Sequence, residues 1–211
     1  MKKILILFII ILLTGCSDEK LENNDSNNIN SKVMGDEIIK NKDIVYKVTS
    51  YADYLYIFPN ELYNTSDLIV LGTFKSNIKT YITDYGNVYT MVEFKIEEIL
   101  NGNEDKKNIT VSYKGGIVTL KEFLEVKTKE EIKKYGLEDI NPEGKYVEFV
   151  EKDKKIKLDK NKKYLLFLNK DSNEISDYIS VSNGYSILEV IDNKIFDEYT
   201  KEYITIDSLK K

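Results

Sequence analysis

Cys16 carries the most distinctive chemistry in this chain, because it is the only cysteine. A cysteine sulfur can act as a nucleophile, ligate a metal, or form a disulfide or thioether. The chain contains no histidine, which excludes a Ser-His or Cys-His nucleophile pair. A zinc or copper site would need carboxylates alone, an unfavourable ligand set for these metals. We therefore expect no metal site and no cofactor.

The segment before Cys16 has the layout of a bacterial export signal. Residues 1–3 form a cationic start, and residues 4–13 are uninterrupted apolar. Ten apolar residues are too few for a membrane-spanning helix, which needs about 20. The segment ends in "LTGC" at 13–16, which resembles the lipobox of bacterial lipoproteins. In that family the cysteine sulfur receives a diacylglyceryl group, and the signal is cut just before the cysteine.

This resemblance implies a location and an anchor. Residues 1–15 would be removed, and Cys16 would become the lipid attachment site, holding the protein on the outer face of the bacterial cell membrane. The acyl chains supply the free energy of membrane binding. A single chain binds a membrane only marginally, whereas two chains bind it stably. The alternative is an ordinary secretory signal in which Cys16 is incidental, although a lone cysteine in an exported protein calls for an explanation.

The overall composition predicts a globular protein that does not bind nucleic acid. Of 211 residues, 42% are hydrophobic and 32% charged, and the net charge is −5. These values allow a substantial core, while nucleic acid favours clustered positive charge. The closest approach to a calcium loop is "DSNEISD" at 171–177. It lacks the glycine of an EF-hand loop, so we interpret it as a solvated turn.

Residues 16–43 are predicted to form a lipidated cysteine and a flexible tether. The stretch "LENNDSNNINSK" has too few apolar residues to bury a core. A tether of about 27 residues would reach roughly 30 Å. Order is expected from Ile44, and residues 44–211 are predicted to form a single β-rich domain.

Within that domain, alternating residues predict a long hairpin. The runs at 67–82 and 88–100 flank the turn "DYGN", and the second run alternates apolar and polar residues with a period of two. Further strands are expected at 108–116 and 162–171, with two or three more at 177–196. Helices are expected at 59–67 and 128–136. In the second, Thr128 is the expected N-cap with Glu131 three residues on, and Gly136 is the expected C-terminal stop. The "NG" and "DN" pairs at 183–184 and 192–193 are interpreted as turns.

This order of elements favours an OB-like barrel, closed or partly open, with one or two short helices. A helix between the third and fourth barrel strands is the OB connectivity. A β-sandwich is the alternative. The stretches "ELYNTSDLIVLGTF", "VYTMVEFKIEEILNG", "ITVSYKGG" and "KKYLLFLNKD" resemble exported bacterial domains of unknown function. They are also distantly similar to the netrin-like and metalloproteinase-inhibitor module.

That resemblance implies a fold rather than an activity. Inhibitors of the related module use a free N-terminal cysteine to clamp the protease zinc. Here Cys16 would be acylated and tethered, and the single cysteine of this chain cannot supply that module's disulfides. We therefore do not extend the inhibitory activity to this protein.

Candidate ligand-binding residues are few. Tyr113, Gly115 and Gly116 could form a bend that lets a ligand approach the backbone, although such glycines also simply end strands. Tyrosines 51, 54 and 56 could stack on a sugar or peptide, or pack in the core. We expect a non-catalytic module that binds an envelope protein or peptide. A glycan- or cell-wall-binding module, or a hydrolase with a carboxylate or Ser-Lys site, are the alternatives.

Overall fold

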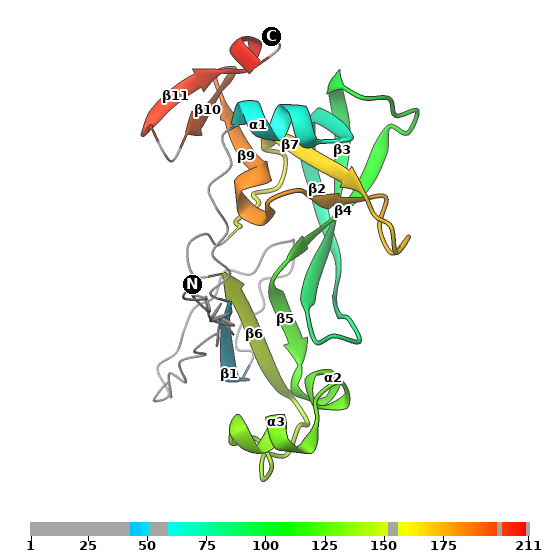
Figure 1. The fold of residues 1–211 in the computed structure, drawn as a ribbon, viewed down its shortest axis with the longest axis vertical. Coiled ribbons are helices and arrows are strands. Elements are labelled where there is room, and N and C mark those ends of the chain that lie inside the picture. The colour runs from blue at the N-terminus through cyan, green and yellow to red at the C-terminus, as the bar shows by residue number, and fades with distance from the viewer. Residues whose placement is uncertain (1–42, 51–58, 152–155, 198–199, 210–211) are drawn as a thin grey trace, which may run out of the picture.

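In the computed structural model of the protein, residues 43–50, 59–151, 156–197 and 200–209 are described. The molecule is elongated, with a barrel at one end and a small sheet at the other (Figure 1). The strands are β1 (Asp43–Ser50), β2 (Leu68–Ile82), β3 (Val88–Asn101), β4 (Asn108–Lys114), β5 (Gly116–Thr119), β6 (Lys145–Glu151), β7 (Lys163–Lys170), β8 (Tyr178–Ser180), β9 (Ile187–Ile191), β10 (Lys194–Asp197) and β11 (Glu202–Thr205). The helices are α1 (Pro59–Thr65), α2 (Leu120–Glu125) and α3 (Lys129–Lys134), with 3-10 turns η1 (Asn183–Ser186) and η2 (Ile206–Leu209).

The fold is mainly β and contains an OB-like, partly open barrel. Strands β2, β3 and β4 form an antiparallel meander, β7 pairs antiparallel with β2, and β8 pairs with both β7 and β4. The β4–β8 pairing is parallel, as the OB topology requires. It joins Val111 to Tyr178 and Ser112 to Ile179, so hydrogen-bonded pairing closes the ring over a short stretch.

The barrel interior is filled by the buried faces of its strands. Alternation in β3 buries Val92 and Phe94, as the sequence pattern predicts, while Lys95 between Phe94 and Ile96 is exposed. The interior cluster consists of Leu68, Val70, Phe74, Val92, Phe94, Ile109, Val111, Tyr113, Leu158, Tyr164, Leu166, Leu168, Tyr178 and Ile187. Strand β7 is buried on both faces, which explains its nearly continuous apolar run.

The other face of β2 and β7 is covered by α1 and the C-terminal elements. The cluster beneath them consists of Leu62, Ile69, Leu71, Leu165, Phe167, Leu188, Ile195, Ile206 and Leu209. Helix α1 begins at Pro59, and its Tyr63 hydroxyl donates to the Leu100 carbonyl at 3.1 Å. The predicted helix is confirmed there, and its packing fixes the end of β3.

The insertion between β4 and β7 is larger than the helix we predicted from sequence. The chain leaves the barrel at Gly115 and Gly116, and β5 pairs with β6, which also pairs with β1. This three-stranded sheet packs with α2 and α3 around Phe123 and Val147. Strand β1 begins at Asp43, one residue before the predicted start of order.

Both insertion helices begin with a capping box. The predicted cap of α3 is confirmed, since Thr128 Oγ1 accepts from the Glu131 amide while the Glu131 carboxylate accepts from the Thr128 amide at 2.9 Å. Gly136 follows the helix with φ +64°, as a helix-stopping glycine should. Helix α2 uses the same device through Thr119 and Glu122, which the sequence analysis overlooked.

The C-terminal part differs from prediction in two places. Residues 183–186 form the 3-10 turn η1 rather than a two-residue hairpin turn. Beyond Asp197, which sequence left unassigned, β11 pairs with β10, and η2 buries Ile206 and Leu209. The "DN" turn is confirmed, with positive φ at Asp192 and Asn193.

Candidate functional site

A polar pocket of about 310 Å³ lies where the two loops beside the barrel closure meet. One loop joins β3 to β4, and the other joins β7 to β8. Because β4 and β8 run parallel, both begin at the same end of the barrel, which brings the two loops together. The pocket is lined by Asn103, Glu104, Asp105, Lys106, Lys170, Asp177 and Tyr178.

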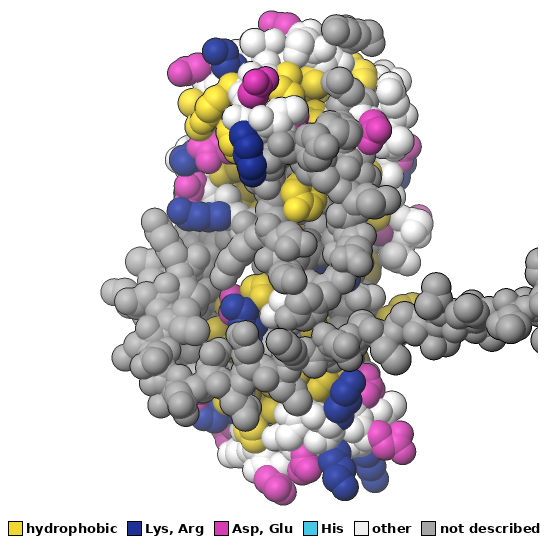
Figure 2. Space-filling model, turned by 60° about the vertical axis from the view of Figure 1, so that its left-hand side comes forward, with side chains coloured by type: hydrophobic (Ala, Val, Ile, Leu, Met, Phe, Trp, Pro, Cys, Tyr) yellow, Lys and Arg dark blue, Asp and Glu magenta, His cyan; other side chains and the backbone are white. Residues whose placement is uncertain are grey.

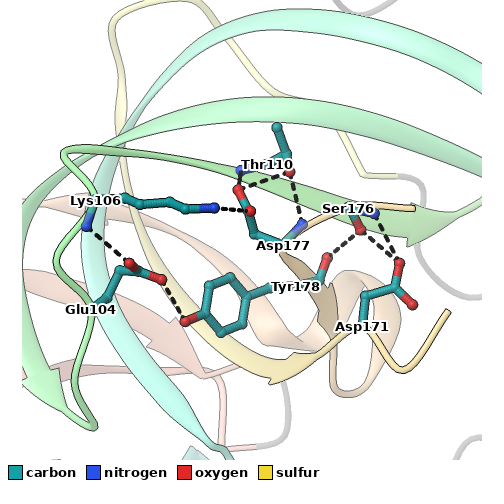
Figure 3. Close-up of polar contacts among 7 residues, drawn as sticks. All are labelled: Glu104, Lys106, Thr110, Asp171, Ser176, Asp177 and Tyr178. Carbon is teal, nitrogen blue, oxygen red and sulfur yellow. Dashed lines mark hydrogen bonds and ion pairs between the residues drawn. The ribbon is translucent and has the colours of Figure 1, made fainter. Parts of the chain in front are cut away.

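Asp177 is fixed at the start of β8 by donors from β4 and its preceding loop. Its Oδ2 accepts from the Thr110 amide at 2.8 Å and from Thr110 Oγ1 at 3.0 Å. Its Oδ1 is paired with the Lys106 ammonium, as Figure 3 shows. The Asp177 amide in turn donates to Thr110 Oγ1 at 2.8 Å. The carboxylate therefore has a defined position at the pocket wall.

Glu104 is held in a similar way on the opposite loop. Its Oε1 accepts from the Lys106 amide at 2.9 Å, and its Oε2 accepts from the Tyr178 hydroxyl at 2.7 Å (Figure 3). The Tyr178 ring belongs to the barrel core, so only the polar tip of this side chain serves the pocket. The Tyr178–Glu104 and Lys106–Asp177 contacts thus tie the two loops together.

Residues 171–177 form a turn, as predicted, and side-chain hydrogen bonds hold it in shape. Asp171 Oδ1 accepts from the Asn173 amide, and its Oδ2 accepts from the Ser176 amide, each at 3.0 Å. Ser176 Oγ donates to the Tyr178 carbonyl at 2.8 Å. Asp171 and Ser176 are buried, at 7% and 8% exposed, while residues 172–175 between them are exposed, so the turn is solvated in its middle and anchored at its ends. The turn aims the following Asp177 and Tyr178 at the pocket.

The carboxylates of this region are held in the ionised form. Burial raises the pKa of Asp177, but hydrogen bonds from Lys106 and Thr110 outweigh burial, and the net pKa lies below its usual range. Burial also raises the pKa of Glu104, but hydrogen bonds from the Lys106 amide and the Tyr178 hydroxyl outweigh burial, and the net pKa is lowered. Burial and the hydrogen bond to Glu104 raise the pKa of the Tyr178 phenol. At neutral pH both carboxylates are charged and the phenol is neutral.

These properties favour binding over proton transfer. A general acid or base works best with a pKa near the working pH, and the three groups are shifted away from it. Within the described residues, no group of three or more Asp, Glu, His or Cys side chains could hold a metal ion. Asp105 and Lys170 are exposed at the pocket, and their side chains have no hydrogen bond or ion pair within the described part. They give the rim one charge of each sign for a ligand.

The structure places Tyr113, Gly115 and Gly116 away from this pocket lining. Tyr113 lies in the barrel interior, 2% exposed, where burial raises the pKa of its phenol. Gly116, with φ +132°, packs so closely that a Cβ would meet Thr90 Oγ1 at 2.3 Å. These contacts give Tyr113 and Gly116 a packing role, and ligand binding by the three residues stays a prediction. Cys16 and tyrosines 51, 54 and 56 lie outside the described residues.

The sequence analysis missed Glu104, Lys106, Asp177 and Tyr178 as a group. Each stands in or beside one of two loops, the residues between the predicted strands at 88–100 and 108–116 or the predicted turn at 171–177. A usable signal was present in the predicted topology, because an OB-like barrel brings the starts of its third and fifth strands together. Loops preceding those two strands are therefore neighbours, although their exact partners depend on side-chain packing.

Comparison of the chain with known protein families, curated proteins and solved structures finds no match. Among the described residues, no helix has the length and apolar character needed to cross a membrane. Inference about function therefore rests on the chain itself.

Proposed function

We propose that this protein is a lipid-anchored lipoprotein on the outer face of the bacterial cell membrane. Support for the anchor comes from the tetrapeptide "LTGC" at 13–16 after a cationic and then apolar segment. In this proposal residues 1–15 are removed, Cys16 carries the lipid, and the polar residues up to 43 separate the membrane from the folded part.

The folded part, in the same proposal, is a non-catalytic module that binds a protein or peptide of the envelope. The observation that carries it is the pocket at the barrel closure. Its inner groups, Glu104, Asp177 and Tyr178, are engaged and fixed by internal hydrogen bonds. Asp105 and Lys170 lie at the rim, and neither side chain has a hydrogen bond or ion pair to any residue that the structure describes. Such a site suits a polar segment that carries both charges, as peptides do.

A charge exchange at the rim tests this binding role. The full-length chain with Asp105→Lys and Lys170→Glu together keeps its net charge but reverses the rim. The matched control is Lys121→Glu with Glu125→Lys, an equivalent exchange of exposed residues on α2. We expect an envelope protein to cross-link to the wild type and to the control in similar yield. Its cross-linking yield with the rim variant should be at least tenfold lower. Equal recovery by all three proteins, or no recovery by any, contradicts the proposal.

The two alternatives have separate tests. Glycan binding through tyrosines 51, 54 and 56 predicts sedimentation with purified peptidoglycan that is lost when all three are replaced by alanine. A His-free hydrolase predicts turnover that is lost in Glu104→Gln or Asp177→Asn. The lowered pKa values of these two carboxylates favour the binding module over the hydrolase.

A further inference from the structure

The pocket at the barrel closure has a net negative charge. Its lining contains three carboxylates and two ammonium groups, which leaves a formal charge of −1; they belong to Glu104, Asp105, Asp177, Lys106 and Lys170. On the face of the molecule shown in Figure 2, Lys side chains are interspersed with Asp and Glu side chains over the described residues. Interspersed charges produce little field at a distance. The charge preference of a ligand is therefore decided by the local groups of the pocket.

The Glu104 carboxylate lacks a cationic partner of its own. Its donors are all neutral, namely the Tyr178 hydroxyl and the backbone amides of Asp105 and Lys106. The Lys106 ammonium pairs instead with Asp177, and Figure 3 shows it directed at that carboxylate, while Glu104 lies beside the Lys106 backbone. Among the described residues, no ammonium group forms an ion pair with Glu104.

Glu104 is nevertheless ionised and fixed in position. The neutral donors outweigh burial, so its pKa lies below the usual value. Tyr178 is 3% exposed and belongs to the barrel core, which fixes the hydroxyl that holds Oε2. A carboxylate has about four lone pairs, and these three donors leave one of them free. A fixed carboxylate of this kind favours a cation that can donate a charge-assisted hydrogen bond.

Two exposed side chains surround this position. Asp105 follows Glu104 directly in the chain, and its carboxylate has no hydrogen bond or ion pair to any described residue, so it can share a cation with Glu104. Lys170, at the end of β7, offers an ammonium for a carbonyl or carboxylate of the same ligand. The volume of about 310 Å³ is small for a ligand pocket, and it admits a side chain with adjoining backbone rather than a folded element.

We propose that the pocket binds a basic side chain, lysine or arginine, of the partner peptide, and that Glu104 is the acceptor that determines this specificity. Asp105 is the second carboxylate for the same cation. This inference rests on the proposed function, because it names the group that the partner presents. An acidic side chain would bring like charge against Glu104, and a neutral one would leave the Glu104 charge without a counterion.

Calorimetric titration of the full-length chain in detergent with three short peptides tests the inference. The peptides have acetylated and amidated ends, and they differ only in a central lysine, norleucine or glutamate between glycines. Norleucine keeps the aliphatic chain but has no charge. Glu104→Gln removes the proposed acceptor charge while its amide oxygen can still accept from Tyr178. Asp105→Asn changes an exposed side chain, and Glu125→Gln on α2 is the matched control.

We expect the lysine peptide to bind about tenfold or more tightly than the other two, since a hydrogen bond between charged groups contributes about that factor. Its affinity should fall by a similar factor in Glu104→Gln, fall less in Asp105→Asn and stay unchanged in Glu125→Gln. Thermal unfolding checks each variant, and if Glu104→Gln does not fold, Asp105→Asn and the norleucine comparison decide the result.

Three results would overturn the inference. Equal affinity for the three peptides, or a preference for glutamate, would leave a peptide-binding module with a different ligand class. Lysine binding that is unchanged in both Glu104→Gln and Asp105→Asn would place the basic side chain elsewhere. No binding of any peptide would also overturn it, while the rim exchange decides separately whether the module binds an envelope protein.

Discussion

Asp177 and Thr110 bind each other reciprocally across the closure of the barrel. The Thr110 amide and hydroxyl donate to Asp177 Oδ2 at 2.8 and 3.0 Å, and the Asp177 amide donates to Thr110 Oγ1 at 2.8 Å. Next to this pair, β4 and β8 are joined by a pairing of only two residues from each strand. The closure of the barrel therefore depends on these side-chain contacts as well as on the backbone ladder.

Thr110→Val and Asp177→Asn should each destabilise the fold by about 1–3 kcal/mol, because each leaves partly buried polar groups without their partners. Thr110→Ser keeps the hydroxyl and should cost much less. Chemical denaturation of the single and double variants gives the coupling energy, which we expect to be about 1–2 kcal/mol. Strictly additive effects would mean that the two side chains act independently.

The same carboxylates make stability depend on pH. The folded-state pKa values of Asp177 and Glu104 lie below their ordinary values of 3.8 and 4.5. The two ionised carboxylates therefore contribute their full stabilisation when the pH is well above these ordinary pKa values. That stabilisation is lost as the pH falls through the ordinary values toward the lower folded-state pKa values. The free energy of unfolding of the wild type should decrease through this acid range.

Asp177→Asn provides the control for this pH dependence, since the amide does not titrate there. The difference in unfolding free energy between wild type and Asp177→Asn should be largest near neutral pH and shrink as the pH drops below 3.8. Denaturation curves at a series of pH values measure it. A difference that stays constant over the whole range would show that Asp177 is not held in its ionised form.

Gly116 and Gly136 form a matched pair for testing close packing. Both have positive φ, but a Cβ on Gly116 would meet Thr90 Oγ1 at 2.3 Å, whereas one on Gly136 meets nothing within 4 Å. Gly136→Ala should cost about 1–2 kcal/mol from backbone conformation alone. Gly116→Ala should cost clearly more, both from this contact and because a φ of +132° is less accessible to alanine than +64°, as measured by thermal unfolding. Equal costs would argue against the tight contact between β5 and the β2–β3 hairpin.

The C-terminal turn η2 should contribute measurably to stability. Leu209 is buried in the cluster that covers β2 and β7. Leu209→Ala removes those contacts, and we expect a loss of about 2–5 kcal/mol. Ser208→Ala, at an exposed neighbour, is the control and should change stability by less than about 1 kcal/mol. A small effect of Leu209→Ala would mean that η2 is not part of the core.

Local patterns predicted the elements that depend on neighbouring residues. The β2–β3 hairpin followed from period-two alternation around "DYGN", and α3 from the Thr128–Glu131 capping box. The OB-like order of strands followed from the position of the helix between the third and fourth barrel strands. The first two of these signals act within about 15 residues, a range over which spacing alone carries the information.

Long-range pairings were not predictable in the same way. The parallel β1–β6 pairing joins segments about 100 residues apart, such as Val48 and Phe149. The pocket likewise joins Lys106 to Asp177, two residues in loops with no local pattern in common. The tail beyond Asp197 was too polar and too short to assign from sequence, because its buried residues are single side chains such as Ile206 between exposed ones. Tertiary packing decides these cases.

Mass spectrometry of the mature N-terminus, after metabolic labelling with a palmitate analogue, is the most direct test of the proposed lipoprotein. We predict a chain that begins at Cys16 and carries a diacylglyceryl thioether on its sulfur. Cys16→Ser should abolish labelling and the cleavage before residue 16, while Ser17→Ala should retain both. A wild-type chain that begins at any other residue, or that carries no acyl group on Cys16, would contradict the account.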